Sequence, residues 1–160
     1  MRVGISGHQR LRDPGGWDWV RQEMRTCLTS LSEPLVGITS LSIGADTLFA
    51  HLVLELGGSL AVVVPFADYE ARFVTEAARQ DYRNLLGQAA TIEVLEKKDT
   101  DDEGYYAAGK RVTDLSELLL VVWDGKPAAG LGGTADIAAY AHERNKEIVH
   151  LNPETRTVTP

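Results

Sequence analysis

Cysteine is nearly absent from this chain of 160 residues. Cys27 stands alone, so the sequence can form neither an internal disulfide nor a cluster of thiolate metal ligands. It lies among apolar residues in a helical pattern, which is typical of a small buried side chain rather than of a catalytic thiol. The four histidines include no pair at metal-ligand spacing. We therefore expect neither a metal site nor a cofactor.

Long apolar runs and a surplus of basic residues are missing as well. No apolar run approaches the roughly 20 residues that span a membrane, and the first residues lack the charged-then-apolar pattern of a signal peptide. We therefore expect a cytoplasmic protein with no membrane partner. Asp and Glu outnumber Lys and Arg by 23 to 16, which gives a formal net charge of −7. Because nucleic-acid binding neutralises many phosphates with basic side chains, we expect no nucleic-acid partner, whereas a small phosphorylated ligand needs only one local positive pocket.

Short apolar runs rich in β-branched residues alternate with longer helical patterns along the chain. The expected strands are 2–6, 35–42, 59–66, 91–96, 118–124 and 147–152, and the expected helices are 17–32, 45–57, 69–88, 104–115 and 134–145. Continuous apolar runs are typical of strands buried on both faces of a parallel sheet. Strict alternation of strand and helix predicts an α/β fold, a Rossmann-like doubly wound and mainly parallel sheet of about six strands flanked by helices.

The length favours one domain. We assign residues 1–152 to it and treat 153–160, which show no periodicity, as a C-terminal tail. In an open parallel sheet, ligands bind outside the carboxyl ends of the strands, where the chain turns into the next helix. We therefore expect the functional site in the strand-to-helix loops, of which three have unusual sequences.

The first loop, SGHQR (6–10), follows the opening strand. Gly7 lets the backbone pass close to a ligand, and His8 and Arg10 offer hydrogen-bond donors beside it. A tight turn with solvated side chains explains the same residues, so this loop alone does not decide between the two interpretations.

The second loop, SIGADTLFA (42–50), runs into the next helix. Gly44 and Ala45 would leave room for a ligand, while Asp46 would hydrogen-bond a ribose hydroxyl. The helix dipole and N-terminal capping explain an acidic residue in the first helical turn equally well. This motif is weak when taken alone.

The third loop lies within WDGKPAAGLGGTADIAAYA (123–141) and is the most informative. An apolar strand runs into Asp124 and Gly125, and a glycine-rich stretch follows. Its glycines are Gly130, Gly132 and Gly133, and Thr134 then opens an Ala-rich helix. Clustered glycines are best tolerated where something must come close, and the free N–H groups of a helix start together with the Thr134 hydroxyl form an anion site. The alternative is a flexible connection capped by Thr134.

Two common phosphate-binding motifs are absent from this loop. No Lys-Ser/Thr pair follows the glycines, so it is not a Walker loop. It does not follow the first strand either, where the dinucleotide fingerprint belongs. The sequence therefore predicts phosphate binding by glycines, cap and helix together.

The three segments together resemble the SLOG superfamily. The resemblance covers residues 3 to 152 and is most specific over 117–141. That superfamily includes LOG-type phosphoribohydrolases, DprA-like DNA-processing domains and nucleotide-sensing domains of bacterial defence systems. The resemblance implies a Rossmann-like sheet with a nucleotide-type ligand at the glycine-rich loops, and often a homodimer.

The sequence departs from the pattern of the LOG-type enzymes, which cleave the N-glycosidic bond of a nucleoside 5′-monophosphate. In that pattern Gly-Thr is followed by two residues and then a glutamate, a place that Ile137 takes here. Asp136 lies one residue early, about 100° around a helix. The LOG arginine on the preceding helix has Lys110 and Arg111 as its counterparts, without a clean match in spacing.

Three functions therefore stay open. The first is binding of a nucleotide or nucleotide-derived small molecule by a sensor or ligand-binding domain, with Lys110 and Arg111 as further phosphate partners. The second is an N-glycosidase, in which a carboxylate stabilises positive charge on the sugar, with Asp136 or Asp46 as the catalytic residue and Asp124 as a third candidate. The third is single-stranded DNA binding of the DprA-like kind, which the negative net charge disfavours.

Overall fold

The computed structural model describes all 160 residues as an α/β fold with one seven-stranded sheet. The strands are β1 (Arg2–Gly7), β2 (Val36–Thr39), β3 (Ser59–Val64), β4 (Thr91–Val94), β5 (Leu118–Val122), β6 (Glu147–Asn152) and β7 (Thr157–Thr159). The helices are α1 (Gly16–Thr29), α2 (Ala45–Glu55), α3 (Glu76–Gly87), α4 (Asp101–Leu115) and α5 (Thr134–Glu143), with a 3₁₀ turn η1 (Tyr69–Arg72). The sheet order is β4-β3-β2-β1-β5-β6-β7, and every pairing except β6 with β7 is parallel. The predicted Rossmann-like sheet is confirmed.

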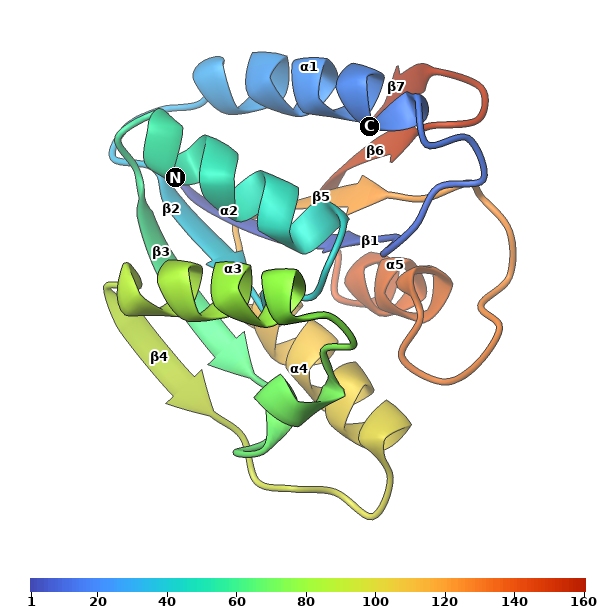
Figure 1. Cartoon of the computed structure of the whole chain (residues 1–160). Coiled ribbons are helices and arrows are strands. Elements are labelled where there is room, and N and C mark those ends of the chain that lie inside the picture. The colour runs from blue at the N-terminus through green and yellow to red at the C-terminus, as the bar shows by residue number, and fades with distance from the viewer.

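Helices cover both faces of the sheet (Figure 1). Successive strand residues point to opposite faces, so Leu60, Val62 and Val64 enter the core beneath α1, α2 and α3, whereas Ala61 and Val63 enter the core beneath α4 and α5. This double burial explains why the central strands are apolar without interruption. Each large apolar side chain that becomes fully buried stabilises the fold by about 1.5–3 kcal/mol.

The central strand β1 pairs with β2 on one side and with β5 on the other. The chain leaves β1 and β2 toward the face of α1 and α2, and leaves β5 toward α5 on the opposite face. The loops after β1 and β5 therefore diverge at adjacent strand ends. This arrangement opens a crevice at the carboxyl edge of the sheet, which is the usual ligand position in such folds.

The segment expected to form one helix over 69–88 is divided. Residues Tyr69–Arg72 form the 3₁₀ turn, and α3 begins only at Glu76. Thr75 has an extended backbone, with φ −106° and ψ 152°, and its hydroxyl accepts a hydrogen bond from the Ala78 N–H at 3.1 Å. This N-cap ends any continuous helix, because a capping threonine cannot keep helical dihedrals.

Both edges of the sheet differ from the sequence prediction. The strand β4 is an edge strand, so Ile92 and Val94 remain 51% and 54% exposed instead of buried on both faces. At the other edge, β7 lies within the segment 153–160 that was treated as a tail, and Val158 pairs with Leu151 of β6. Three residues are too few to show a periodicity in sequence. None of the helices combines the length and apolarity that a membrane crossing requires.

Candidate functional site

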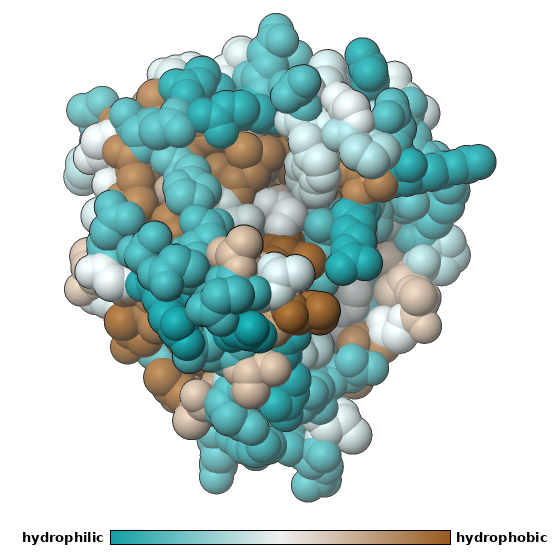
Figure 2. Space-filling view, in the orientation of Figure 1, coloured by the Kyte–Doolittle hydropathy of each residue, from teal (hydrophilic) through white to brown (hydrophobic).

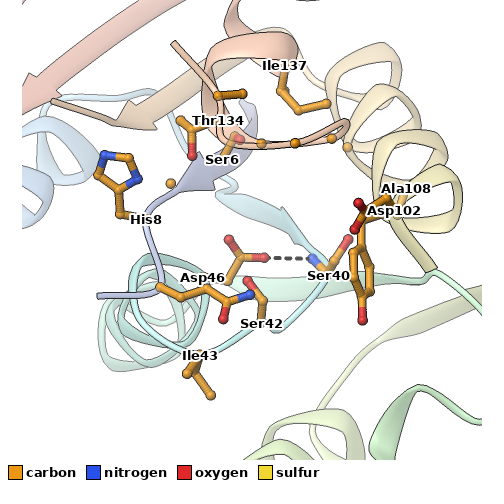
Figure 3. Close-up of a pocket in the computed structure, with 18 of the residues that line it drawn as sticks. Ser6, His8, Ser40, Ser42, Ile43, Asp46, Asp102, Ala108, Thr134 and Ile137 are labelled. Carbon is orange, nitrogen blue, oxygen red and sulfur yellow. Dashed lines mark hydrogen bonds between the residues drawn. The ribbon is translucent and has the colours of Figure 1, made fainter. Parts of the chain in front are cut away.

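A cleft of about 850 Å³ lies at the carboxyl edge of the sheet, between the loops that follow β1, β2 and β5. Ligand pockets in proteins have volumes of about 300–1,000 Å³, so this cleft can hold a small molecule of nucleotide size. Nine of the residues singled out in the sequence line it: Gly7, His8, Arg10, Asp46, Asp124, Gly130, Gly132, Gly133 and Thr134. Figure 3 shows Thr134 and Ser6 on one side of the space and Asp46 on the other, with His8 and Asp102 at opposite ends.

The glycine-rich loop before α5 is folded against the protein. Gly132 has φ +86°, and a Cβ there would lie 2.8 Å from the backbone nitrogen of Tyr106 on α4. Its N–H donates to Oδ2 of Asp136 at 2.9 Å. Asp136 thus closes the loop, and it does not line the cleft. Only glycine gives the loop both the left-handed conformation and this close approach to α4.

The start of α5 offers unpaired donors to the cleft. The N–H groups of Gly133, Thr134 and Ala135 make no hydrogen bond within the protein, whereas the next amide, Asp136 N–H, donates to the Gly133 carbonyl at 3.0 Å. Free amides at a helix N-terminus carry partial positive charge and bind anions. All three residues line the cleft. This end of the site is therefore suited to a phosphate.

The loop after β1 fills the space that the sequence analysis left for a ligand at Gly44 and Ala45. A Cβ on Gly44, which has φ +86°, would lie 2.5 Å from the carbonyl oxygen of Gln9. The Ala45 N–H donates to the His8 carbonyl at 3.1 Å, and Ala45 is fully buried. A Cβ on Gly7 would lie 2.5 Å from the Ala45 Cβ. The small residues at these positions let two backbones meet, so Gly44 and Ala45 leave no room for a ligand.

Asp46 lies at the base of the cleft and is 6% exposed. Its Oδ2 accepts a hydrogen bond from the Thr39 hydroxyl at 3.0 Å. It accepts another from the Ser40 N–H at 3.2 Å (Figure 3). Burial raises the pKa of Asp46 to about 6, although these hydrogen bonds act in the opposite direction. Asp46 makes no side-chain capping bond to α2. It therefore orders the β2–α2 loop rather than the helix start.

His8 and Asp124 join the loops after β1 and β5. Nε2 of His8 lies 3.2 Å from the Asp124 backbone nitrogen and 3.3 Å from its Oδ1. Burial raises the pKa of Asp124, but the hydrogen bond from the Lys126 N–H and the nearby His8 outweigh it and hold the pKa below the ordinary value. Gly125, with φ +82°, turns the chain so that the Lys126 N–H can donate to Oδ1 of Asp124. Gly125 does not itself line the cleft.

The cations of the cleft differ in how they are paired. Arg72 pairs with Asp101 at 2.7 Å, and Lys126 pairs with Glu154 at 3.1 Å. Arg10 is exposed and forms no ion pair or hydrogen bond through its side chain. Among the arginines and lysines of the cleft, Arg10 is therefore the one whose charge no carboxylate of the protein neutralises.

Lys110 and Arg111 lie away from the cleft. Arg111 pairs with Glu93 of β4 at 2.9 Å, and the Lys110 ammonium lies 4.5 Å from the ring centre of Tyr106. Both face the outer side of α4, so they cannot hold a phosphate at the glycine-rich loop. Ile137 is 2% exposed and packs against Gly109 of α4, where a Cβ would lie 2.4 Å from its Cδ1. The position of the LOG glutamate thus lies between α4 and α5, where Ile137 is part of the core and also lines the cleft (Figure 3).

One wall of the cleft was not predicted from the sequence. Tyr69 and Phe73 from the η1 region and Tyr105 from α4 line it, and the Tyr69 and Tyr105 rings are 6.1 Å apart. These aromatic residues follow different strands and have no shared spacing. Only the break of the expected helix at Thr75 and the packing of η1 against α4 bring them together.

Comparisons with known proteins establish the fold. No protein-family model matches the chain, and no curated protein matches its sequence. DNA processing protein A from Streptococcus pneumoniae is similar in structure, with a TM-score of 0.70 and 16% identity over 93% of this chain and 49% of that protein. DNA processing protein A from Helicobacter pylori, whose structure was described for its single-stranded DNA binding mode, has a TM-score of 0.68 and 16% identity over 94% of this chain and 64% of that one.

A third similar structure is TM1055, a structural-genomics target, with a TM-score of 0.58 and 11% identity over 92% of this chain and 71% of that chain. The chain spans about half the length of the first of these proteins and just under two thirds of the second. The chain therefore has the Rossmann-like fold of the DNA processing proteins, as the resemblance in the sequence implied.

Proposed function

We propose that this protein binds a nucleotide or nucleotide-derived small molecule in the cleft, as a sensor or ligand-binding domain. The observation that carries the proposal is that the unpaired amides of Gly133, Thr134 and Ala135 and the unpaired Arg10 side chain line the same cleft. Backbone amides and a planar guanidinium are both strong phosphate donors. The phosphate would lie between them.

The base of the cleft supports a sugar next to this phosphate position. The Asp46 carboxylate is an acceptor, and a ribose presents hydroxyl donors to such a group. Because burial raises the pKa of Asp46 to about 6, the carboxyl is mainly ionised at neutral pH and can accept these hydrogen bonds.

Calorimetric titration tests the phosphate position. We expect the nucleoside 5′-monophosphates to bind at least about tenfold more tightly than the matching nucleosides, since charge-assisted hydrogen bonds to phosphate contribute about 1.5–3 kcal/mol. Arg10→Ala should weaken nucleotide binding about tenfold. Arg12→Ala removes the same charge two residues along the chain, outside the cleft, and should leave affinity within about twofold.

Two results would contradict the proposal. One is the absence of binding for all four common nucleoside monophosphates at millimolar concentration. The other is equal affinity for nucleosides and nucleotides, because the phosphate would then contribute nothing at the amides and Arg10.

Hydrolysis by a LOG-type mechanism is the alternative function. With an isoleucine at the glutamate position and Asp136 bound to Gly132, the candidate carboxylates that line the cleft are Asp46 and Asp124, and Asp46 lies at its base. Incubation with nucleoside monophosphates followed by chromatography for free base tests it. Sustained base release that Asp46→Asn abolishes would replace the binding proposal with an enzymatic one.

Single-stranded DNA binding is a second candidate because the fold matches two DNA processing proteins, one of them described for that activity. The net charge of −7 opposes it. A homodimer also remains a proposal, which sedimentation velocity with and without nucleotide would test.

A further inference from the structure

The cleft extends beyond the space that a phosphate and a sugar require. Its far end lies between the first turn of α4 and the η1 region, opposite His8 (Figure 3). Tyr69, Phe73, Tyr105 and Asp102 line this end. The surface of the molecule is mainly hydrophilic in Figure 2, with hydrophobic residues showing between the hydrophilic ones. A ligand that fills this end must offer an aromatic surface and a polar edge together.

The ring of Tyr105 is held in place by its neighbours. It lies 5.8 Å from the Phe66 ring and 6.1 Å from the Tyr69 ring, measured between centroids, and it is partly buried. Tyr69 in turn packs edge-on against Phe73 at 5.2 Å. A ring fixed in this way can stack on a planar heterocycle without losing much side-chain freedom.

Asp102 lies one helical turn before Tyr105, so the two side chains leave the same side of α4. The adjacent Asp101 is paired with Arg72, whereas the Asp102 carboxylate has no hydrogen bond or ion pair within the protein. A Cβ on Gly130 would lie 3.5 Å from its Oδ2, so the carboxylate lies beside the glycine-rich loop at this end of the cleft. A carboxylate only accepts hydrogen bonds, with two oxygens side by side.

We propose that this end of the cleft binds a guanine-type base, stacked on Tyr105, with its N1–H and 2-amino group donating to the Asp102 carboxylate. This inference rests on the proposed nucleotide binding. Guanine presents two adjacent donors on one edge, which matches the two oxygens of a carboxylate. Adenine presents an acceptor, N1, at the corresponding place, and this acceptor is repelled by the carboxylate.

Titration with three purine nucleotides tests the assignment. Inosine 5′-monophosphate differs from guanosine 5′-monophosphate only in lacking the 2-amino group. We expect the guanine nucleotide to bind at least about fivefold more tightly than the inosine nucleotide, and more tightly than adenosine 5′-monophosphate. In Asp102→Asn, which offers one acceptor and one donor group, the ratio between guanine and inosine nucleotides should fall to about one.

Glu103→Gln is the matched control. It removes the same charge from the same turn of α4, but Glu103 does not line the cleft, so the guanine preference should persist. Equal affinities in the wild type, tighter binding of the adenine nucleotide, or a preference that survives Asp102→Asn would each overturn the base assignment while leaving nucleotide binding intact. If the wild-type protein bound none of the nucleotides, the proposed function would be overturned together with this inference.

Discussion

Glycines near the cleft contact protein backbone more than they leave room for a ligand. Gly44 and Gly132 both have φ +86°, and a Cβ on either would collide with the backbone of another loop or helix. Gly7 likewise faces the Ala45 side chain. Glycine-rich sequence was interpreted as space for a phosphate, whereas at these positions it provides close contact between loops. The donors that the cleft offers to an anion are instead the free amides at the start of α5.

The pH dependence of stability should report on Asp46. Its pKa is about 6 in the folded protein against an ordinary value of 3.8, which approximates the unfolded chain. Between these values the folded state holds the proton more often, so the contribution of Asp46 to stability is greatest below pH 3.8 and declines as the pH rises to about 6. The loss is on the order of 3 kcal/mol, from 1.36 kcal/mol per pKa unit.

Asp46→Asn removes this titration while keeping an oxygen that accepts from Thr39 and Ser40. We expect the variant to gain stability relative to the wild type as the pH rises from about 4 to 7. Urea unfolding of both proteins at several pH values measures this difference, and other titrating groups cancel because both chains share them. A difference that does not change with pH would show that Asp46 titrates normally.

At the scale of elements, the start of α5 depends on the loop that precedes it. The loop is anchored at Gly132 by Asp136 and by the backbone of α4. A Cβ on Gly133 would lie 2.9 Å from the Ala128 Cβ, so a side chain there displaces the loop rather than only filling an anion site. The position of the free amides at the start of α5 thus depends on the conformation of the glycine-rich loop before them.

We expect Gly133→Val to weaken nucleotide binding more than about tenfold, because the displaced loop misaligns the free amides. Gly87→Val is the control, since no atom lies within 4 Å of a Cβ there and Gly87 does not line the cleft, so it should stay within about threefold of the wild type. Calorimetry gives the affinities, and thermal unfolding checks that both variants fold. Unchanged affinity in Gly133→Val would mean that the phosphate does not bind at this loop.

At the scale of the whole molecule, the negative net charge opposes the binding of nucleic acid more than that of a small phosphorylated ligand. A net charge of −7 repels a polyanion along its length, whereas one phosphate meets only the local potential of Arg10 and the α5 amides. The fold alone does not distinguish these ligands, because DNA processing proteins share it.

We therefore expect no gel shift of a single-stranded oligonucleotide of about 30 nucleotides at about 150 mM salt and up to about 10 µM protein. Lower salt should change little, since few basic side chains are available to displace counterions. A shift at submicromolar protein that weakens steeply with added salt would favour the DNA-binding candidate over a mononucleotide.

The strand and helix order could be predicted because burial on both faces leaves an uninterrupted apolar run in each central strand, as in β3 and β5. Two features could not be predicted from the sequence. The strand β7 has only three residues, and the helix break at Thr75 depends on one capping side chain. The sequence also predicted that Arg10 and the start of α5 lie at the carboxyl edge of the sheet, because parallel strands place the loops that follow them at one edge.

Only the tertiary structure decided which of the residues singled out in the sequence line the cleft. Gly44 and Ala45 meet the loop after β1, and Lys110 and Arg111 turn to the outer side of α4. Tyr105 and Asp102 enter the cleft through the packing of α4 against η1 and the glycine-rich loop. Local sequence sets backbone conformation and periodicity, but the direction of a side chain relative to distant loops depends on contacts that form only when the layers pack together.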